Sequence, residues 1–387
     1  MSRRYQVMGE LARWLPGAGR ARRDVVVVFT QGHLGDVLHA APMMRSLREA
    51  RPGWKIVWLM GPWVLPLAER FEVFVDEIVS FASDSFCHHR GEQEHRQSAW
   101  VQWRLGLRLR AMRPRAYIFT GNESPVARYL ANMTGAEIWS GIGDRRPPRV
   151  GKGIRTCFVP YEKERYEADA LMQLLRPLGI DVPQAGAELF FPVDEASRRF
   201  AENFMRREGV GAERPLVLIS PGSGWRGKNW PVGRFREVAA WLEREQGAQV
   251  AWIGSAGEAA LAGNAPLPGK NWFGRFSIPE LAAVMERAAL WLGNDSGPMH
   301  LATAVGCPTV SLWGPTEPGK WAPRGERHRH IRRMERCPGC EYWNPAKRCL
   351  QPNHACMEAI PVGAVETALA EIGLVTVQEK SPPSMGM

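Results

Sequence analysis

Short apolar runs alternate with segments of helical spacing twice along this chain of 387 residues. In the first region, residues 24–145, the runs are DVVVVFT, KIVWLMG, VDEIVSF, AYIFTGN and EIWSGIG. In the second region, which follows residue 190, they are PLVLIS, QVAWIGS, NWFG, LWLGND and PTVSLWG. Such alternation predicts parallel strands joined by helical crossovers. We therefore expect an α/β fold with two Rossmann-like domains.

The segment between these regions, residues 144–190, is rich in proline, glycine and charged residues, which predicts a linker. Ligands of open α/β sheets bind beyond the carboxyl ends of the strands. Two parallel sheets that face each other across a cleft would therefore place functional residues on both of its walls. The expected parts are a basic N-terminal extension (1–23), an N-terminal Rossmann-like domain (24–185), a C-terminal Rossmann-like domain (186–360), and a C-terminal helix and tail (361–387).

The charge balance favours an anionic partner, because 50 lysine and arginine residues against 40 aspartate and glutamate residues give a formal net charge of +10. A nucleic acid is not expected, since no recognised motif and no basic face with aromatic residues is present. No apolar stretch approaches the roughly 18 residues of a membrane span. The N-terminus also lacks a signal-peptide pattern, so we expect a cytoplasmic location.

The first two dozen residues combine six arginines with Tyr5, Leu11, Trp14 and other apolar side chains. A short amphipathic helix lying on an anionic membrane surface has this composition. A basic extension without fixed structure explains the same residues equally well.

A glycine-rich stretch, ISPGSGWRGKNWP (219–231), follows the first strand of the second region. It is not a P-loop, because Asn229 stands where Ser or Thr would hold magnesium and Pro231 interrupts the helix. It is not a dinucleotide motif either, because the next strand ends without an acid. What remains is a loop that carries Lys228 and has room for a phosphate near its backbone. The alternative is a surface loop with an exposed lysine.

The stretch LWLGNDSGPMHLATAVGCPTVSLWGPT (290–316) predicts a buried strand followed by a helix. Asp295, Ser296 and Gly297 lie where that helix begins, and His300 lies in its first turn. Free backbone N–H groups at this point form a ready anion site. Helix capping by Asp295 or Ser296 is the alternative, and the two roles are compatible.

A capping box is predicted at Ser277, because Glu280 follows three residues later in FSIPEL. It would start a helix over 278–289 and fix the loop that holds Phe276.

In order along the chain, GDVLHAAP, PGSGWRGKNWP, FSIPEL, NDSGPMHLATAVGCPTVSLWGPTEPGKWAP and a late cysteine cluster together resemble glycosyltransferase family 9, the heptosyltransferases of lipopolysaccharide core assembly. The resemblance implies a GT-B fold, in which the first domain binds the acceptor and the second the donor. It implies an inverting, metal-independent transferase with ADP-heptose as donor and a lipid-linked glycan as acceptor. It also implies a peripheral position at the inner face of the cytoplasmic membrane, whose surface is anionic.

By the same resemblance, Asp36 is the general base, and Lys228 is a catalytic group that stabilises the leaving diphosphate. The resemblance assigns the remaining donor-binding positions to Ser223, Gly224, Glu258, Phe276, Asp295, Ser296, Gly297 and His300. From spacing alone, Asp36 would be an N-cap of a helix that runs through Ala50.

Acceptor contacts are expected from the basic segment SAWVQWRLGLRLRAMRPR (98–115), through Arg104 and Arg108, and from Asn122 and Arg128 near a strand end. His39, one turn after Asp36, is a further candidate. A solvated helix with an apolar stripe toward the core explains residues 98–115 as well, and His39 could equally be a packed helix histidine.

Four cysteines, Cys337, Cys340, Cys349 and Cys356, have the spacing C-x2-C-x8-C-x6-C. This spacing is compatible with a structural zinc site or with reduced thiols, and disulfides are less expected in a cytoplasmic chain. No cofactor is expected for catalysis.

Two other functions fit parts of the pattern. One is a GT-B transferase that uses a UDP-sugar. The other is a catalytically inactive protein that binds a sugar nucleotide, although such a protein would not need the base Asp36.

Overall fold

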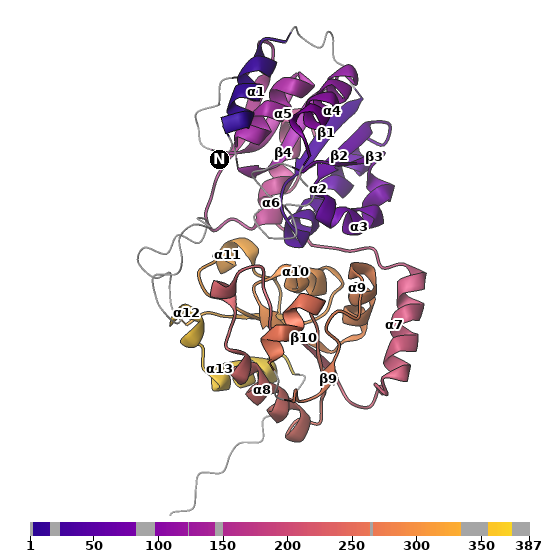
Figure 1. Ribbon diagram of the computed structural model, residues 1–387, viewed down its shortest axis with the longest axis vertical. Helices are drawn as coiled ribbons and strands as arrows, with labels where there is room; N and C mark the ends of the chain where they lie inside the picture. Colours follow the sequence, from indigo (N-terminus) through magenta and orange to yellow (C-terminus); the bar gives the residue numbers. More distant parts are fainter. Residues whose placement is uncertain are drawn as a thin grey trace, which may run out of the picture. The chain divides into compact units, whose positions relative to one another are not determined.

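The computed structural model describes residues 3–15, 24–82, 97–122, 124–143, 150–263, 266–333 and 355–373. The chain divides into two compact units. The first comprises residues 1–192 together with 319–321, and the second comprises 193–318 together with 322–387 (Figure 1).

The first unit contains a parallel six-stranded sheet with the order β3-β2-β1-β4-β5-β6. Its central strand β1 is the run VVVVFT, and all six of its residues are buried. A strand that is covered on both faces needs such a continuous apolar sequence. The strands are β1 (Val25–Thr30), β2 (Lys55–Met60), β3 (Glu77–Ser80), β4 (Ala116–Asn122), β5 (Ile138–Gly143) and β6 (Arg155–Pro160).

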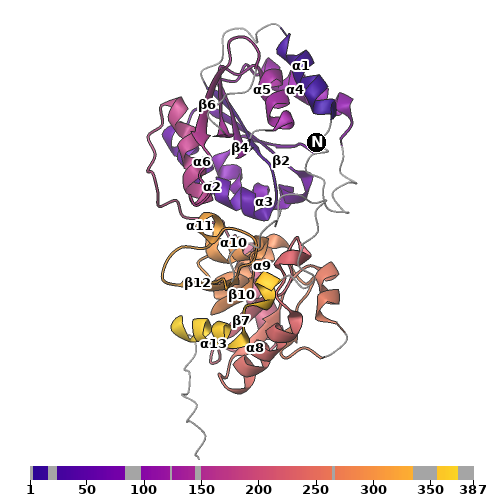
Figure 2. The same cartoon turned by 90° about the vertical axis from the view of Figure 1, so that its left-hand side faces the viewer.

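Helices cover both faces of this sheet. On one face α1, α4 and α5 pack against alternate strand residues such as Val27 and Phe29, and Figures 1 and 2 both show these three helices side by side. On the other face α2 packs against α6. The helices are α1 (Arg3–Arg13), α2 (Leu34–Ala50), α3 (Leu65–Ala68), α4 (Ala99–Ala111), α5 (Pro125–Thr134) and α6 (Glu167–Met172).

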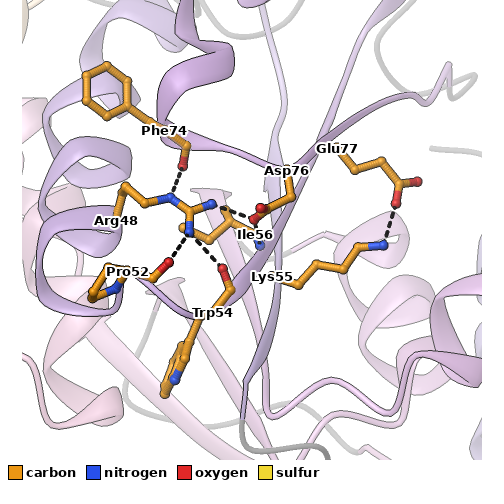
Figure 3. A network of polar contacts seen from close by, with 8 residues as sticks. All are labelled: Arg48, Pro52, Trp54, Lys55, Ile56, Phe74, Asp76 and Glu77. Carbon is orange, nitrogen blue, oxygen red and sulfur yellow. Dashed lines mark hydrogen bonds and ion pairs between the residues drawn. The ribbon is translucent and has the colours of Figure 1, made fainter.

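The last turn of α2 is held to the strands by Arg48 (Figure 3). Its guanidinium donates to the carbonyls of Pro52 (2.8 Å), Trp54 (2.9 Å) and Phe74 (3.3 Å) and pairs with Asp76. Asp76 in turn accepts the N–H of Ile56 in β2 at 2.7 Å. A cation in the last turn also suits the helix dipole, so this network fixes the end of α2 opposite to its first turn.

The second unit contains another parallel six-stranded sheet, with the order β12-β11-β10-β7-β8-β9. Renumbered within the unit, this is the same order as in the first sheet. The strands are β7 (Leu216–Ser220), β8 (Gln249–Trp252), β9 (Lys270–Asn271), β10 (Leu290–Asn294), β11 (Thr309–Leu312) and β12 (His328–Ile331). The strand order reverses between β1 and β4 in the first sheet and between β7 and β10 in the second, and ligands bind at such switch points.

The core of the second unit joins the sheet to helices on one face, where Phe235 of α8 and Val365 and Leu369 of α13 are fully buried. In the same unit α7 packs against α9. The helices that begin after residue 192 are α7 (Glu195–Arg207), α8 (Val232–Arg244), α9 (Ile278–Arg287), α10 (Gly297–Ala304), α11 (Pro318–Trp321), α12 (Ala355–Glu358) and α13 (Val362–Glu371).

The α/β fold with two Rossmann-like sheets is confirmed, but two strands lie where none was predicted. Strand β6 falls inside the stretch 144–190 that we expected to be a linker, and β12 falls in the basic run 324–336. Both are edge strands that are only partly buried, so polar residues are tolerated and the apolar signal is lost.

Within the N-terminal segment, residues 3–13 form a helix and not a basic extension without fixed structure. Tyr5 and Ala12 are buried against the first unit, and the Tyr5 hydroxyl donates to the Gln102 side chain of α4 at 2.9 Å. Helix α1 therefore belongs to the helical layer over β1 and β4.

Candidate functional site

Asp36 lies at the carboxyl edge of the first sheet, three residues inside α2, directly after the loop that leaves β1. Its carboxylate accepts the backbone N–H of His33 at 2.7 Å. Gly32 makes room for it, because a Cβ atom at Gly32 would lie 2.1 Å from Asp36 Oδ2. Gly32 also has φ +129°, a conformation that other residues rarely adopt.

The N-cap position predicted for Asp36 is wrong, because His33 is the N-cap and Asp36 is the third residue of the helix. The carboxylate does cap a backbone group, but from inside the first turn. Burial raises the pKa of Asp36, and the His33 N–H and the charge of His33 oppose this rise. A carboxylate with a raised pKa is a stronger base when it is ionised, which suits proton abstraction.

His39 is fully buried in α2. Its ring lies 5.2 Å from the ring centroid of Tyr166 and 5.2 Å from that of Trp321, edge-on to both. This is the geometry of a packed histidine, and an acceptor contact by His39 stays a prediction.

Asn122 is the last residue of β4, and Arg128 lies in the first turns of α5 directly after it. Because β1 and β4 are parallel neighbours, both residues lie at the same edge of the sheet as Asp36. Asn122 has no described side chain.

Of the two arginines predicted on α4, Arg108 lies away from Asp36. Arg108 pairs with Glu77, the first residue of β3, so it lies at the amino edge of the sheet, opposite to Asp36. Arg104 is exposed and stacks over Trp100, with its Cζ 4.6 Å from the ring centroid. The structure therefore does not bring Arg108 together with Asp36.

In the second unit, Lys228 and Asp295 form a buried ion pair between the loop after β7 and the end of β10. Lys228 Nζ lies 2.9 Å from Asp295 Oδ2, which also accepts the Thr316 hydroxyl at 2.6 Å. Burial alone would raise the pKa of Asp295, but Lys228, Thr316 and the charge of His300 outweigh it, and the net pKa is lowered. The exposed-lysine alternative is wrong, because Lys228 is only 9% exposed.

His300 is buried in the first turn of α10. Burial lowers its pKa to about 4, and the positive charge of Lys228 adds to this effect, while Asp295 opposes it. His300 is therefore neutral at pH 7. It can donate one N–H to a ligand but supplies no full charge.

Helix α10 begins at the switch point between β7 and β10. Ser296 is its N-cap and Gly297 its first residue. The Ser296 hydroxyl is buried and has no hydrogen-bond partner within the described part of the chain. A buried hydroxyl without a partner is costly, so this one is suited to a ligand at the helix N-terminus, where an anion is favoured.

The loop after β7 is fixed from both sides. Ser223 Oγ lies 2.7 Å from the carbonyl of Trp225 and 2.5 Å from Asn229 Oδ1, and Gly224 follows it. The fully buried Asn294 accepts the N–H of Trp230 at 3.0 Å and donates to the carbonyl of Pro221 at 2.7 Å. Its position next to Asp295 at a strand end is a signal that we did not use.

Glu258 and Phe276 flank the same edge of the second sheet. Glu258 accepts the N–H (2.7 Å) and the hydroxyl (2.9 Å) of Ser255, and a Cβ atom at Gly222 would lie 1.9 Å from its carboxylate. Glu258 is thus held next to the glycine-rich loop.

Phe276 packs in an aromatic cluster, with its ring centroid 4.9 Å from that of Phe204 and 5.9 Å from that of Trp272. The capping box that follows it is confirmed, because Glu280 accepts the N–H and the hydroxyl of Ser277, each at 2.7 Å. The helix ends at Arg287, two residues before the predicted end.

Cys337, Cys340 and Cys349 lie outside the described residues, and Cys356 is buried in α12. Within the described ranges, no group of three or more histidine, cysteine or acidic side chains is arranged to hold a metal ion. None of the helices in those ranges has both the length and the apolar character that a bilayer-spanning segment requires.

Comparison with known proteins adds independent evidence. The model of glycosyltransferase family 9 (heptosyltransferase) matches residues 132–347. The lipopolysaccharide heptosyltransferase 1 of Pseudomonas aeruginosa is 34% identical over 327 residues, which are 81% of this chain and 85% of that protein. The lipopolysaccharide heptosyltransferase 2 of Salmonella typhimurium is 27% identical over 322 residues, 79% of this chain and 87% of that protein.

Two solved structures share the fold. A glycosyl transferase family 9 structure from Veillonella parvula has a TM-score of 0.71 at 22% identity and covers 91% of this chain and 98% of its own. The ADP-heptose lipopolysaccharide heptosyltransferase II of Escherichia coli has a TM-score of 0.63 at 21% identity and covers 90% and 98%.

Proposed function

This chain belongs to glycosyltransferase family 9, and we propose that it transfers a heptose or a closely related sugar from ADP-heptose to a lipid-linked glycan of the lipopolysaccharide core class, with inversion at the anomeric carbon. The relatives are named for this activity on lipopolysaccharide, and a related solved structure is named for ADP-heptose. The alternative donor is a UDP-sugar, and an experiment must distinguish it from ADP-heptose.

One observation carries the proposal. The buried Ser296 hydroxyl, which has no partner within the described residues, lies at the start of α10 next to Asp295, the ion-pair partner of Lys228. A helix N-terminus, a hydroxyl donor and a lysine at a topological switch point form a site for a diphosphate. In the transition state, the same donors would stabilise the charge that develops on the leaving group.

In the proposed reaction, an acceptor hydroxyl attacks the anomeric carbon of the donor sugar. Asp36 takes the hydroxyl proton as the new carbon–oxygen bond forms. The bond to the nucleoside diphosphate breaks, and the diphosphate leaves with the bonding electron pair toward Lys228 and the N-terminus of α10. A single carboxylate suffices, because inversion needs no covalent intermediate.

The proposal is tested by a thermal-shift screen with ADP, UDP, ADP-heptose and UDP-glucose, followed by an assay of ADP release with a heptose-deficient lipopolysaccharide as acceptor. We expect ADP and ADP-heptose to raise the melting temperature, since a ligand that binds only the folded state stabilises it. ADP release should require the acceptor. Stabilisation by the UDP compounds alone would replace the donor assignment, and binding without turnover would indicate an inactive sugar-nucleotide-binding protein.

For the acceptor, we propose that Arg128 and Asn122 contact its anionic groups, because both lie at the same sheet edge as Asp36. Arg128 is a suitable donor to carboxylate or phosphate oxygens.

We further propose that the enzyme works in the cytoplasm at the anionic inner surface of the membrane, and that α1 and α4 dock there. Val7 and Leu11 of α1 and Trp14 directly after it are 57%, 60% and 77% exposed, at the i, i+4, i+7 spacing of one helix side. Trp100 of the adjacent α4 is 64% exposed and carries Arg104 over its ring. Exposed apolar side chains with arginines beside them suit an anionic bilayer surface.

This docking is tested by sedimentation with vesicles of phosphatidylcholine alone or with phosphatidylglycerol added. We expect the protein to bind only the anionic vesicles and the L11E/W14E variant to bind several-fold more weakly. Deletion of α1 is unsuitable, because it would uncover the core that Tyr5 and Ala12 contact. The control is V73E, which changes another exposed residue of the same unit (74%). Equal binding by L11E/W14E and V73E would exclude the α1 surface.

A further inference from the structure

A buried ion pair lies in the first unit, next to the helix that carries Asp36. Lys320 Nζ lies 3.0 Å from Glu167 Oε2, and the two side chains are only 9% and 11% exposed. Glu167 is the first residue of α6, and Lys320 belongs to the three residues 319–321 that group with the first unit. Neither residue was among the predicted site residues.

Aromatic rings hold this pair in place. Lys320 Nζ lies 4.3 Å from the ring centroid of Tyr161 and 5.2 Å from that of Trp321. The ring of His39, one turn after Asp36 on α2, packs edge-on against Trp321 and against Tyr166, the N-cap of α6. The same packing therefore joins α2, α6 and Lys320, so the ammonium has little freedom to move away.

Asp36 and Glu167 are two carboxylates, and Lys320 is the cation that acts on both. Burial raises the pKa of each carboxyl group, Lys320 lowers both, and the charge of Asp36 further raises the pKa of Glu167. Two neighbouring carboxylates repel each other, so each ionises more readily when the other is neutral. The charge state of one therefore depends on how strongly Lys320 interacts with the other.

We propose that Lys320 and Glu167 are positioning residues that set how much of Asp36 is ionised and ready to accept a proton. The positive charge of Lys320 favours the ionised form of Asp36. Glu167 weakens this effect, because its negative charge offsets part of the positive charge of Lys320. This inference rests on the proposed role of Asp36 as the general base.

Other titratable side chains lie on the elements around Asp36. His33 faces it from the loop before α2 and donates its backbone N–H. His39 lies on α2 between the rings of Tyr166 and Trp321. On α6, Asp169 accepts the N–H of Ala187 at 2.8 Å. The charges of His33 and Lys320 lower the pKa of Asp36, and Asp36 and Glu167 also interact with each other.

The test is the pH dependence of kcat/KM in K320M, E167Q and the double variant. Loss of the cation should move the acid limb of the profile to higher pH, by about one unit for a neighbouring charge. Loss of the Glu167 charge should move the limb to lower pH, because Lys320 then acts on Asp36 alone. The double variant removes one charge of each sign, so its limb should return close to that of the wild type.

The control is E162Q, which removes an exposed carboxylate five residues before Glu167 that pairs with Arg165 at 3.2 Å. We expect its acid limb to match that of the wild type. A purely structural role would lower kcat/KM without opposite displacements of the limb, and this outcome would overturn the inference.

Two further outcomes also decide between the explanations. If K320M does not fold, E167Q decides alone, because an unchanged or raised limb contradicts the inference. If the Asp36→Asn variant keeps full activity, the base assignment itself fails, and that failure is distinct from an absence of limb displacement in an enzyme that needs Asp36.

Discussion

The Asp36→Asn variant is expected to transfer sugar about 10² to 10⁴-fold more slowly than the wild type, the range that a positioned base contributes. An amide cannot take the proton of the acceptor hydroxyl. Its oxygen can still accept the His33 N–H, so the start of α2 should be kept. Donor binding should also survive, because the donor groups proposed above all lie in the second unit.

The measurements are the rate of ADP release and the thermal shift with ADP. The control is E49Q, which removes an exposed carboxylate from the same helix. We expect E49Q to behave as the wild type. Near-normal turnover of the Asp36→Asn variant would exclude Asp36 as the base, whereas loss of ADP binding would show that the substitution acts through the fold.

The Lys228→Met variant is expected to lose both transfer and stability. Removal of the cation leaves Asp295 buried without its partner at 2.9 Å, and breaking one side of a buried pair costs about 3 to 5 kcal/mol. Transfer is lost for a different reason, because the diphosphate loses a positive charge that no neutral side chain replaces.

The double variant K228M/D295N separates these two effects. It removes the uncompensated charge, so we expect the free energy of unfolding, measured with urea, to recover most of the loss. ADP binding and transfer should stay impaired in the double variant. The control is K270M, which changes a partly buried lysine of the same unit outside the site. If the double variant regains transfer, Lys228 has no role in donor chemistry and serves Asp295 alone.

The sequence predicted the central strands and the positions of the site loops well. Strands β1 and β10 are apolar up to their last residues, Thr30 and Asn294, because a strand covered on both faces favours apolar side chains. Asp36 and Asp295 come shortly after these two strands, so their place at the carboxyl edges of the sheets followed from parallel topology alone. The Ser277 capping box was equally legible, because it is a contact between residues three apart.

The edge strands β6 and β12 were not predictable in the same way. Their residues are partly exposed, and exposed positions do not constrain composition. Arg108 illustrates a second limit. Its type and spacing suggested an acceptor contact, but its pairing with Glu77 places it at the opposite edge of the sheet, and that depends on how α4 returns across the strands.

The charge states of the site depend on contacts between distant residues. Lys228 meets Asp295 across 67 positions of sequence, and Asp295 meets Thr316 across 21. Glu167 and Lys320 were not predicted as site residues, and they meet beside α2. No local sequence pattern predicts such pairs, because each residue is compatible with the secondary structure of its own segment and gives no sign of its remote partner.

The two parallel sheets, the loops that carry polar groups and the family membership of this protein could all be predicted from the amino-acid sequence. Those properties follow from apolar periodicity and short-range hydrogen bonding, which act between neighbours in the chain. The burial of Lys228, the neutral state of His300 and the sharing of Lys320 between two carboxylates arise from packing of remote segments. The burial and the charge state of a side chain depend on the residues that surround it in the folded protein. They are therefore determined only when the remote segments pack together.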